Sequence, residues 1–225
     1  MPRKGKLIVF LGPVGVGKST IIRGLTQTLR ARGFKVSTVL IKSFHGPSYI
    51  LWVFIAKMLG IKSGYAPWFV IPRSGRTNLA KVLGAISRYL DIFLLIPLKL
   101  MKIKLLKSIG YYVISEEYLY STLLDYAYPI SDLKRGSKFV DIPIRVLNAL
   151  ISKYVPDSTI VLIASMPELR RRWALRGYGD PQLRYVAMQY MFLSRLSHAL
   201  IIDTTSMSIK ETLDKILSEV VQDAS

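Results

Sequence analysis

Five short runs of apolar and β-branched residues alternate with longer segments in which apolar residues recur at helical spacing. The short runs lie at residues 6–11, 35–41, 110–115, 159–164 and 198–202. Continuous apolar runs of this length are typical of strands that are buried on both faces. Helical spacing is found at residues 21–32, 142–154, 168–176, 182–197 and 209–222. In a chain of 225 residues, this alternation predicts one α/β domain over residues 1–225.

The stretch between residues 48 and 109 is more apolar than the rest of the chain and is predicted to be helical. Charged residues interrupt it, among them Lys57, Arg88, Asp91 and Lys99. No run therefore reaches the roughly 20 uncharged residues that cross a bilayer. Pro97 is expected to kink or end the helix that begins near Asn78.

Two interpretations of this apolar segment stay open. In the first, it is a helical subdomain that packs on the core and closes one side of a substrate pocket. An exposed apolar interface with a second copy is a version of this interpretation. In the second, it forms an interfacial helix on anionic lipid or a pocket for an apolar substrate.

The composition limits the partners and the kinds of active site that the chain can have. Lys and Arg number 32 against 14 Asp and Glu, which gives a net charge of +18. This charge suits an anionic membrane surface or phosphorylated substrates, although a generally basic surface is the simpler interpretation. The basic residues are spread along the chain without a nucleic-acid module, so no specific nucleic-acid binding is expected. The absence of cysteine excludes a disulfide framework and a thiol nucleophile. We expect a cytoplasmic protein without a secretion signal, peripheral at the membrane in the second interpretation.

A phosphate-binding motif follows the first predicted strand. The motif G-x-x-x-x-G-K-[ST] covers Gly12, Pro13, Val14, Gly15, Val16, Gly17, Lys18, Ser19 and Thr20. Strand, glycine-rich loop and helix follow in the order that a phosphate-binding loop requires. Its backbone N–H groups and the helix N-terminus face an anion. Lys18 is expected to reach the β- and γ-phosphates of ATP, and Ser19 to hold Mg²⁺.

Further candidate residues follow the other predicted strands. Phe44 lies in the loop after the second strand, where a substrate contact is expected. Glu116 and Glu117 end the third strand, where a carboxylate can hold Mg²⁺ or take a proton from an attacking hydroxyl. Arg172 and Arg176 share one helical face and suit a phosphoryl group in transfer. They belong to a predicted lid at about residues 170–184.

Taken together, these motifs resemble the thymidylate kinases, a family of P-loop nucleoside monophosphate kinases. The residues that carry the resemblance beyond the phosphate loop are Tyr118, Ser121, Pro156, Asp157, Thr159, Pro167, Glu168, Arg172 and Arg176. The resemblance covers about residues 5–45 and 108–221.

This resemblance implies a three-layer P-loop fold with a parallel five-stranded sheet flanked by helices. It implies transfer of the γ-phosphoryl of ATP, with Mg²⁺, to a monophosphate, which is dTMP to dTDP in the family. It also implies a moving lid and a homodimer. Lys18, Glu116, Arg172 and Arg176 become the catalytic candidates, with Ser19 and Glu116 at the metal. On the acceptor side the candidates are Phe44, Glu117, Tyr118 and Ser121.

Two departures from the family pattern concern the acceptor. Val14 stands where the family has an acidic residue in the loop, and Glu117 replaces an arginine that meets the acceptor phosphate. A carboxylate at that position would repel a phosphate. The donor half of the site is thus kept and the acceptor half rebuilt. Alternatives are a kinase of a non-nucleotide, lipophilic alcohol, a nucleotide-dependent membrane-surface or regulatory protein, and a nucleic-acid-linked NTPase.

Overall fold

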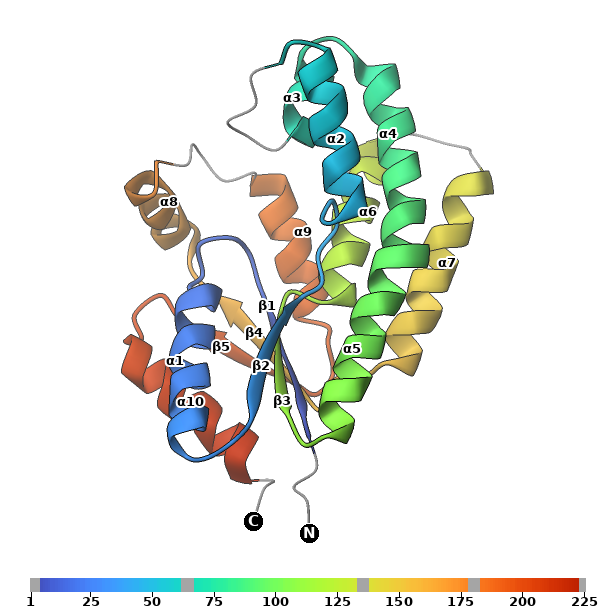
Figure 1. Cartoon of the computed structure of the whole chain (residues 1–225). Coiled ribbons are helices and arrows are strands. Elements are labelled where there is room, and N and C mark those ends of the chain that lie inside the picture. The colour runs from blue at the N-terminus through green and yellow to red at the C-terminus, as the bar shows by residue number, and fades with distance from the viewer. Residues whose placement is uncertain (1–4, 62–66, 133–137, 178–182, 223–225) are drawn as a thin grey trace. The chain divides into compact units, whose positions relative to one another are not determined.

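The computed structural model describes residues 5–61, 67–132, 138–177 and 183–222, which form two compact units. The sheet unit contains the described parts of Met1–Ile41, Lys102–Tyr118 and Val155–Ser225. The helical unit contains those of Lys42–Met101 and Leu119–Tyr154. Figure 1 shows the strands in the first unit and a set of helices in the second. The prediction of a single domain over residues 1–225 stays a prediction.

The sheet unit is built on five parallel strands in the order β2-β3-β1-β4-β5. The strands are β1 (Leu7–Leu11), β2 (Val36–Leu40), β3 (Tyr112–Glu116), β4 (Ser158–Ile163) and β5 (Ala199–Asp203). All five residues of β1 are buried, as its central position requires. The predicted α/β fold with a parallel five-stranded sheet is confirmed, because each predicted apolar run became a strand.

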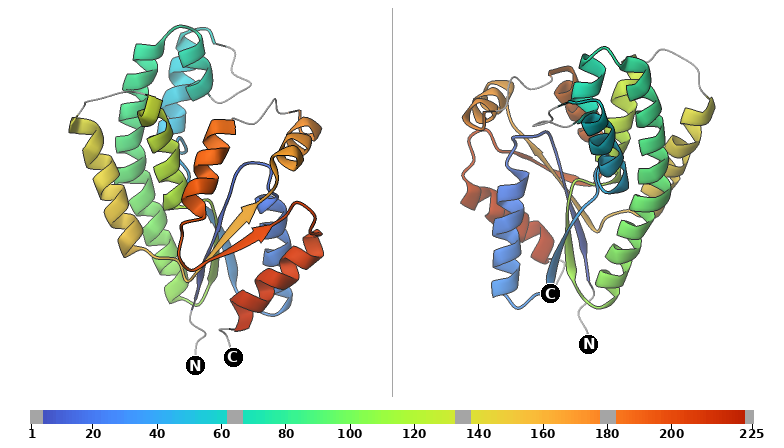
Figure 2. Two further views of the ribbon diagram at one scale, coloured as in Figure 1. Left: turned by 180° about the vertical axis from the view of Figure 1, so that it is seen from behind. Right: turned by 45° about the horizontal axis from the view of Figure 1, so that its top comes forward.

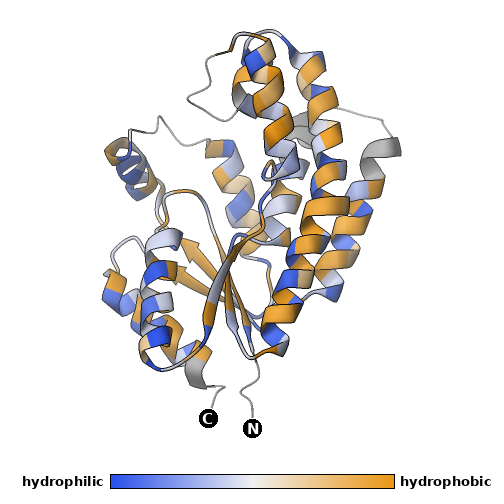
Figure 3. Cartoon of the chain, viewed as in Figure 1, coloured by the Kyte–Doolittle hydropathy of each residue, from blue (hydrophilic) through white to orange (hydrophobic). Residues whose placement is uncertain are grey.

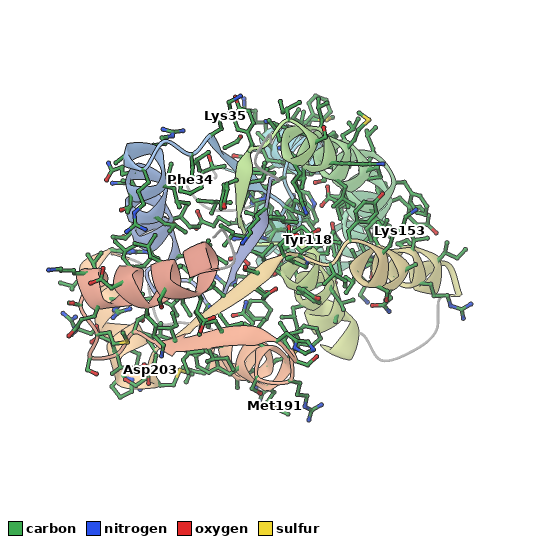
Figure 4. The ribbon with its side chains drawn as sticks, turned by 90° about the horizontal axis from the view of Figure 1, so that it is seen from below. Phe34, Lys35, Tyr118, Lys153, Met191 and Asp203 are labelled. Atoms are coloured by element: carbon green, nitrogen blue, oxygen red, sulfur yellow. The ribbon has the colours of Figure 1, made fainter. Side chains whose placement is uncertain are left out.

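Helices flank this sheet and complete its core. They are α1 (Lys18–Ala31), α8 (Met166–Leu175), α9 (Leu183–Leu193) and α10 (Ile209–Gln222). Figures 1 and 2 show α1 and α10 side by side. Figure 4, seen from below, shows Phe34 beside α1, where its ring centroid lies 4.8 Å from that of Tyr112. Asp157 directly precedes β4. It accepts a hydrogen bond from the Leu7 N–H at 2.6 Å and pairs with Lys107, so it links the start of β1 to the start of β4.

The helical unit holds the apolar middle of the chain. Its helices are α2 (Pro47–Met58), α3 (Pro67–Arg73), α4 (Thr77–Leu90), the π-helical turn η1 (Asp91–Leu95), α6 (Leu119–Asp132) and α7 (Lys138–Lys153), and α5 (Ile96–Ser108) is shared by both units. A separate core centres on Trp52, Ala56, Ile71 and Leu83. No helix among the described residues has the length and apolarity to cross a membrane.

We expected Pro97 to kink or end the helix, and the helix does not end there, because the chain passes Pro97 without leaving the helical conformation. The hydrogen-bond pattern changes earlier, at η1, where the Ile96 N–H donates to the carbonyl of Asp91 five residues back. In a regular helix, a proline ring clashes with the carbonyl four residues before it. The wider π turn lies directly before Pro97 and takes up this conflict.

Candidate functional site

The predicted phosphate loop folds between β1 and α1 in the way its glycines allow. Gly12 has a φ of 136°, and a Cβ there would lie 2.1 Å from the carbonyl oxygen of Leu162. Gly17 has a φ of 99° and forms the N-cap of α1 without a side-chain hydrogen bond. These conformations and close approaches are available to glycine and strain any other residue. The loop therefore keeps its backbone close to β4 and leaves the N-terminus of α1 without a capping side chain.

Lys18 is the buried cation of this loop. Its Nζ donates to the carbonyl oxygens of Gly12 at 2.5 Å and Pro13 at 3.0 Å. It also lies 3.0 Å from Oε1 of Glu117, and only 6% of its surface is exposed. A buried charge is tolerated only with such partners. The ammonium thus folds back over its own loop and pairs with the carboxylate that the sequence assigned to the acceptor side.

Glu117 owes its position to an unusual backbone conformation. Its φ is 64°, which is uncommon for a residue with a side chain. Its N–H donates to the carbonyl of Phe10 at 3.0 Å, and the hydroxyl of Ser115 donates to its carbonyl at 2.6 Å. Such strain persists where surrounding contacts fix it, and it is concentrated at functional sites. The ion pair with Lys18 offsets the negative charge that was expected to repel an acceptor phosphate.

Ser19 and Glu116 meet as predicted. The hydroxyl of Ser19 donates to Oε1 of Glu116 at 2.7 Å, because parallel pairing sets Phe10 of β1 beside Glu116 of β3. A hydroxyl, a carboxylate and substrate phosphates are the oxygen ligands that Mg²⁺ takes in nucleotide sites. The pair therefore fits Mg²⁺ as part of a shared site with a nucleotide. Among the described residues, no group of three His, Asp or Glu side chains could hold a metal alone.

One arginine of α8 is tied to the phosphate loop. Arg172 donates to the Gly15 carbonyl at 3.2 Å and to the Thr204 carbonyl at 2.7 Å. Oε1 of Glu168 lies 2.7 Å from Nε of Arg172 and orients its guanidinium group. Glu168 also pairs with Arg171. The two guanidinium groups lower the pKa of Glu168 to about 2. Arg172 thus connects the phosphate loop to the loop after β5.

Arg176, the other predicted arginine, lies in a different environment from Arg172. Arg176 follows α8 and is exposed, and no hydrogen bond or ion pair of its side chain occurs within the described part of the chain. Trp173 lies between the two and donates from Nε1 to the Val14 carbonyl at 2.8 Å. Residues 178–182 of the predicted lid lie outside the described residues.

The helical unit contains the predicted substrate residue Phe44. Its φ is 56°, and its ring stacks on Trp68 at 5.2 Å with an interplanar angle of 17°. The rings of Trp52 and Tyr126 meet it edge-on. Phe44 is therefore part of an aromatic cluster, and its predicted substrate contact stays a prediction.

A polar cluster beneath these rings was missed by sequence reasoning, which treated its charged members only as interruptions of an apolar segment. Asp91 is fully buried and accepts hydrogen bonds from the Phe44 N–H at 2.7 Å, Ser48 at 2.6 Å and Tyr126 at 2.5 Å. Burial raises the pKa of Asp91, against the hydrogen bonds, which lower it. Burial and the Asp91 charge raise the pKa of the Tyr126 hydroxyl well above its usual value. The sequence signal that could have revealed this cluster was a single acidic residue, Asp91, inside an apolar helical segment.

Arg88 is the second charged residue that sequence reasoning passed over. Only 7% of its surface is exposed, and its Nε has no hydrogen-bond partner among the described residues. Its guanidinium lies 6.0 Å from the ring centre of Tyr126, and burial lowers its pKa. A buried guanidinium with an unused donor can receive an anionic group.

Tyr118 and Ser121 are buried, and both side chains already have interactions. Their predicted roles toward the acceptor stay predictions.

Comparison with known proteins gives the fold a name. No protein-family model matches the sequence, and a search of curated proteins finds no match. A solved thymidylate kinase from Candida albicans, described as having broad substrate specificity and a novel structural element, is similar with a TM-score of 0.59 and 18% identity. The chain has a thymidylate kinase-like fold. The match covers 98% of this chain and 92% of that enzyme, so the thymidylate kinase-like fold also includes the middle segment that the sequence motifs left out.

Proposed function

We propose that the protein is an ATP-dependent phosphotransferase. The observation that carries this proposal is the meeting of Lys18, Ser19, Glu116 and Glu117 at the phosphate loop. The loop N–H groups and the N-terminus of α1 bind the phosphates of ATP, and Lys18 neutralises the β- and γ-phosphates. Ser19 and Glu116 hold Mg²⁺, which supplies charge neutralisation on the phosphate oxygens when bound.

Arg172 of α8 and Arg176, which follows this helix, have different roles in this proposal. Arg172 is a positioning residue, because its bonds to Gly15 and Thr204 hold the loop that carries Lys18. Arg176 is exposed and is the arginine that stabilises the charge on the phosphoryl group in transfer.

Glu117 changes its role when the nucleotide binds. Without ATP it neutralises Lys18, whose Nζ lies 3.0 Å away. When the phosphates take Lys18 as their counterion, the Glu117 carboxylate is released as a base. It accepts the proton of an acceptor hydroxyl while that oxygen bonds to the γ-phosphorus and the bridging P–O bond to ADP breaks. A hydroxyl acceptor needs this base, whereas an ionised phosphate does not.

The acceptor follows from these charges. Thymidylate is the best single candidate from the fold. The Glu117 carboxylate favours a second candidate, an alcohol that is not a nucleotide, because such an acceptor needs a base.

The test is a panel of dTMP, other nucleoside monophosphates, nucleosides and lipophilic alcohols, scored for ATP-dependent phosphorylation. Lys18→Ala is expected to lower turnover about a thousandfold or more. Removing one partner of a buried ion pair also destabilises a protein, so K18A/E117Q, which removes both charges, is measured beside it. Phosphoryl transfer at the normal rate by a folded K18A/E117Q protein would refute the proposal.

The single variant Glu117→Gln separates the two acceptor classes. With a hydroxyl acceptor, loss of the base is expected to lower kcat by about 10²- to 10⁴-fold. With a monophosphate acceptor, kcat should change less than about tenfold, because no proton has to be removed. An equal loss with both classes would contradict the role of Glu117 as a base.

A further inference from the structure

Three successive carbonyl groups of the phosphate loop each accept a hydrogen bond from a side chain outside the loop. In chain order the pairs are Val14 with Trp173 at 2.8 Å, Gly15 with Arg172 at 3.2 Å, and Val16 with Thr204 at 3.1 Å. These three side chains, called the outer donors from here on, lie on α8 and directly after β5. Figure 3 shows hydrophobic positions on β1, whereas α8 also has hydrophilic ones. The loop thus depends on α8 and the end of β5 for donors that β1 does not have.

Thr204 is the most buried of the outer donors, with 5% of its surface exposed. Its hydroxyl lies 3.1 Å from the Val16 carbonyl and 3.0 Å from the Ile163 carbonyl, but a hydroxyl has only one proton to donate. The Ile163 carbonyl already accepts from the Thr204 N–H at 2.8 Å, whereas the Val16 carbonyl has no other donor among the described residues. The hydroxyl proton is therefore needed at Val16. Nη1 of Arg172 donates to the same hydroxyl at 3.1 Å, so two outer donors support each other.

A donor that holds a carbonyl group also sets the direction of the next N–H group. In a planar trans peptide, the C=O and N–H bonds point in opposite directions. The outer donors therefore turn the N–H groups of Gly15, Val16 and Gly17 to the other side of the loop. This is the side of Lys18, because the Val16 N–H points toward the Pro13 carbonyl at 3.5 Å, and that carbonyl also accepts from Lys18 Nζ at 3.0 Å.

These N–H groups have the geometry of an anion site. Those of Gly15 and Gly17 donate to no acceptor within the described part of the chain, and that of Val16 has only the long contact with Pro13. The two glycines have φ values of 97° and 99°, and successive N–H groups in such conformations form the backbone nests that bind phosphate. A Cβ on Gly15 would lie 2.9 Å from the ring of Trp173, so this ring packs directly on the loop. The N–H groups are thus held in place from behind.

We propose that the outer donors are positioning residues that determine the affinity of the loop for phosphate groups. This inference rests on the proposed function, in which the loop binds the phosphates of ATP. Each outer donor acts through one peptide plane. Without the donor, that peptide is free to rotate, and its N–H group has to be ordered again when a phosphate binds, which costs conformational entropy. The effect falls on the binding of ATP and not on the transfer step, because Lys18, Glu117 and Arg176 keep their places.

The experiment measures binding of ATP and of inorganic triphosphate by isothermal titration calorimetry. Thr204→Val removes the hydroxyl and is expected to weaken binding of both ligands about fivefold, the typical effect of one hydrogen bond. Thr204→Ser keeps the hydroxyl and should bind both within about twofold of the parent. Trp173→Phe keeps an aromatic ring without the Nε1 donor. It should weaken binding about threefold, since water can replace part of a bond to the exposed Val14.

Thr212→Val is the matched control in the same unit. Thr212 is 1% exposed, and its hydroxyl donates to the Ser208 carbonyl at 2.9 Å, one turn earlier in the chain. T212V and T204V should therefore lose a similar amount of thermal stability, but T212V should bind ATP and triphosphate like the parent. In steady-state kinetics, T204V should raise the KM for ATP about fivefold at an unchanged kcat. A purely structural role of Thr204 would lower stability without this change in KM.

Two results would overturn the inference. The first is equal affinity of T204V and the parent for triphosphate. The second is weaker binding of ATP by T204V with unchanged binding of triphosphate, which would place the effect of Thr204 at the nucleoside part of ATP. If the parent binds ATP but phosphorylates no acceptor, the proposed kinase is refuted, and fivefold weaker binding by T204V would still support the outer donors. A parent that binds neither ligand would refute both.

Discussion

Replacing Asp91 by alanine is expected to destabilise the helical unit by about 3 kcal/mol. The carboxylate accepts hydrogen bonds from the Phe44 N–H, Ser48 and Tyr126. In the variant, the Ser48 hydroxyl can still donate to the His45 carbonyl at 3.1 Å. The Phe44 amide and the Tyr126 hydroxyl lose their acceptor. A buried donor that is left without an acceptor costs about 1–3 kcal/mol. Two such donors at about 1.5 kcal/mol each give the expected loss of about 3 kcal/mol.

The assay is urea unfolding followed by tryptophan fluorescence. The chain has three tryptophans, and Trp52 and Trp68 belong to the helical unit whereas Trp173 belongs to the sheet unit. A W173F background therefore confines the signal to the helical unit. Tyr126→Phe is the matched control, because it removes one donor and leaves Asp91 with two; it should cost about 1 kcal/mol. A loss for D91A no larger than the loss for Y126F would refute the reasoning.

The pH dependence gives the same prediction a second readout. Burial raises the pKa of Asp91 in the folded protein above the value of about 3.9 in an unfolded chain. The folded state therefore binds this proton more tightly. The resulting stability is complete below the unfolded pKa and is lost as the pH rises through the folded pKa. Asp91→Asn does not titrate, so the parent should lose stability relative to D91N between about pH 4 and the folded pKa. If the stability of the parent relative to D91N instead increased as the pH rises, this would contradict the raised pKa of Asp91.

Three further variants and one control test the phosphate loop and the residues in and after α8. Gly12→Ala should abolish ATP binding and lower the melting temperature, since its Cβ meets a β4 carbonyl oxygen at 2.1 Å; Gly33→Ala, at a positive φ without close atoms, should cost only about 1 kcal/mol. Glu168→Gln should raise the KM for ATP several-fold without changing kcat, because it loosens Arg172; its pKa of about 2 predicts no pH dependence of this effect above about pH 4. Arg176→Ala should instead lower kcat about a hundredfold or more with an unchanged KM, by steady-state kinetics.

The parts of the fold that the sequence predicted are those with local signals. Each strand is one apolar run, and the phosphate loop is fixed by four residues close together in the chain. The contact of Ser19 with Glu116 was also predictable, because the carboxyl ends of adjacent parallel strands lie at one edge of a sheet.

The parts that could not be predicted depend on contacts between distant residues. Asp91 reads as an interruption of an apolar helix until Phe44, Ser48 and Tyr126 surround it. The π turn before Pro97 is also set by tertiary packing, since propensity alone favours a break at that proline. The exposed side of α4 could not be distinguished from its buried side, because apolar residues lie on both.

The replacement at position 117 connects the donor and acceptor questions. An arginine there would lie beside the Lys18 ammonium, whose Nζ now has a carboxylate at 3.0 Å, and two buried cations would repel each other. Glutamate instead gives the buried lysine a counterion in the absence of nucleotide. In the proposed kinase, the phosphates of ATP compete with Glu117 for the same ammonium, so nucleotide binding would be coupled to release of the carboxylate. Because Glu117 cannot attract an acceptor phosphate, any anionic acceptor needs a cation from elsewhere. The class of the acceptor thus depends on how much the released base at Glu117 contributes to kcat/KM, which E117Q measures with a hydroxyl acceptor and with a monophosphate.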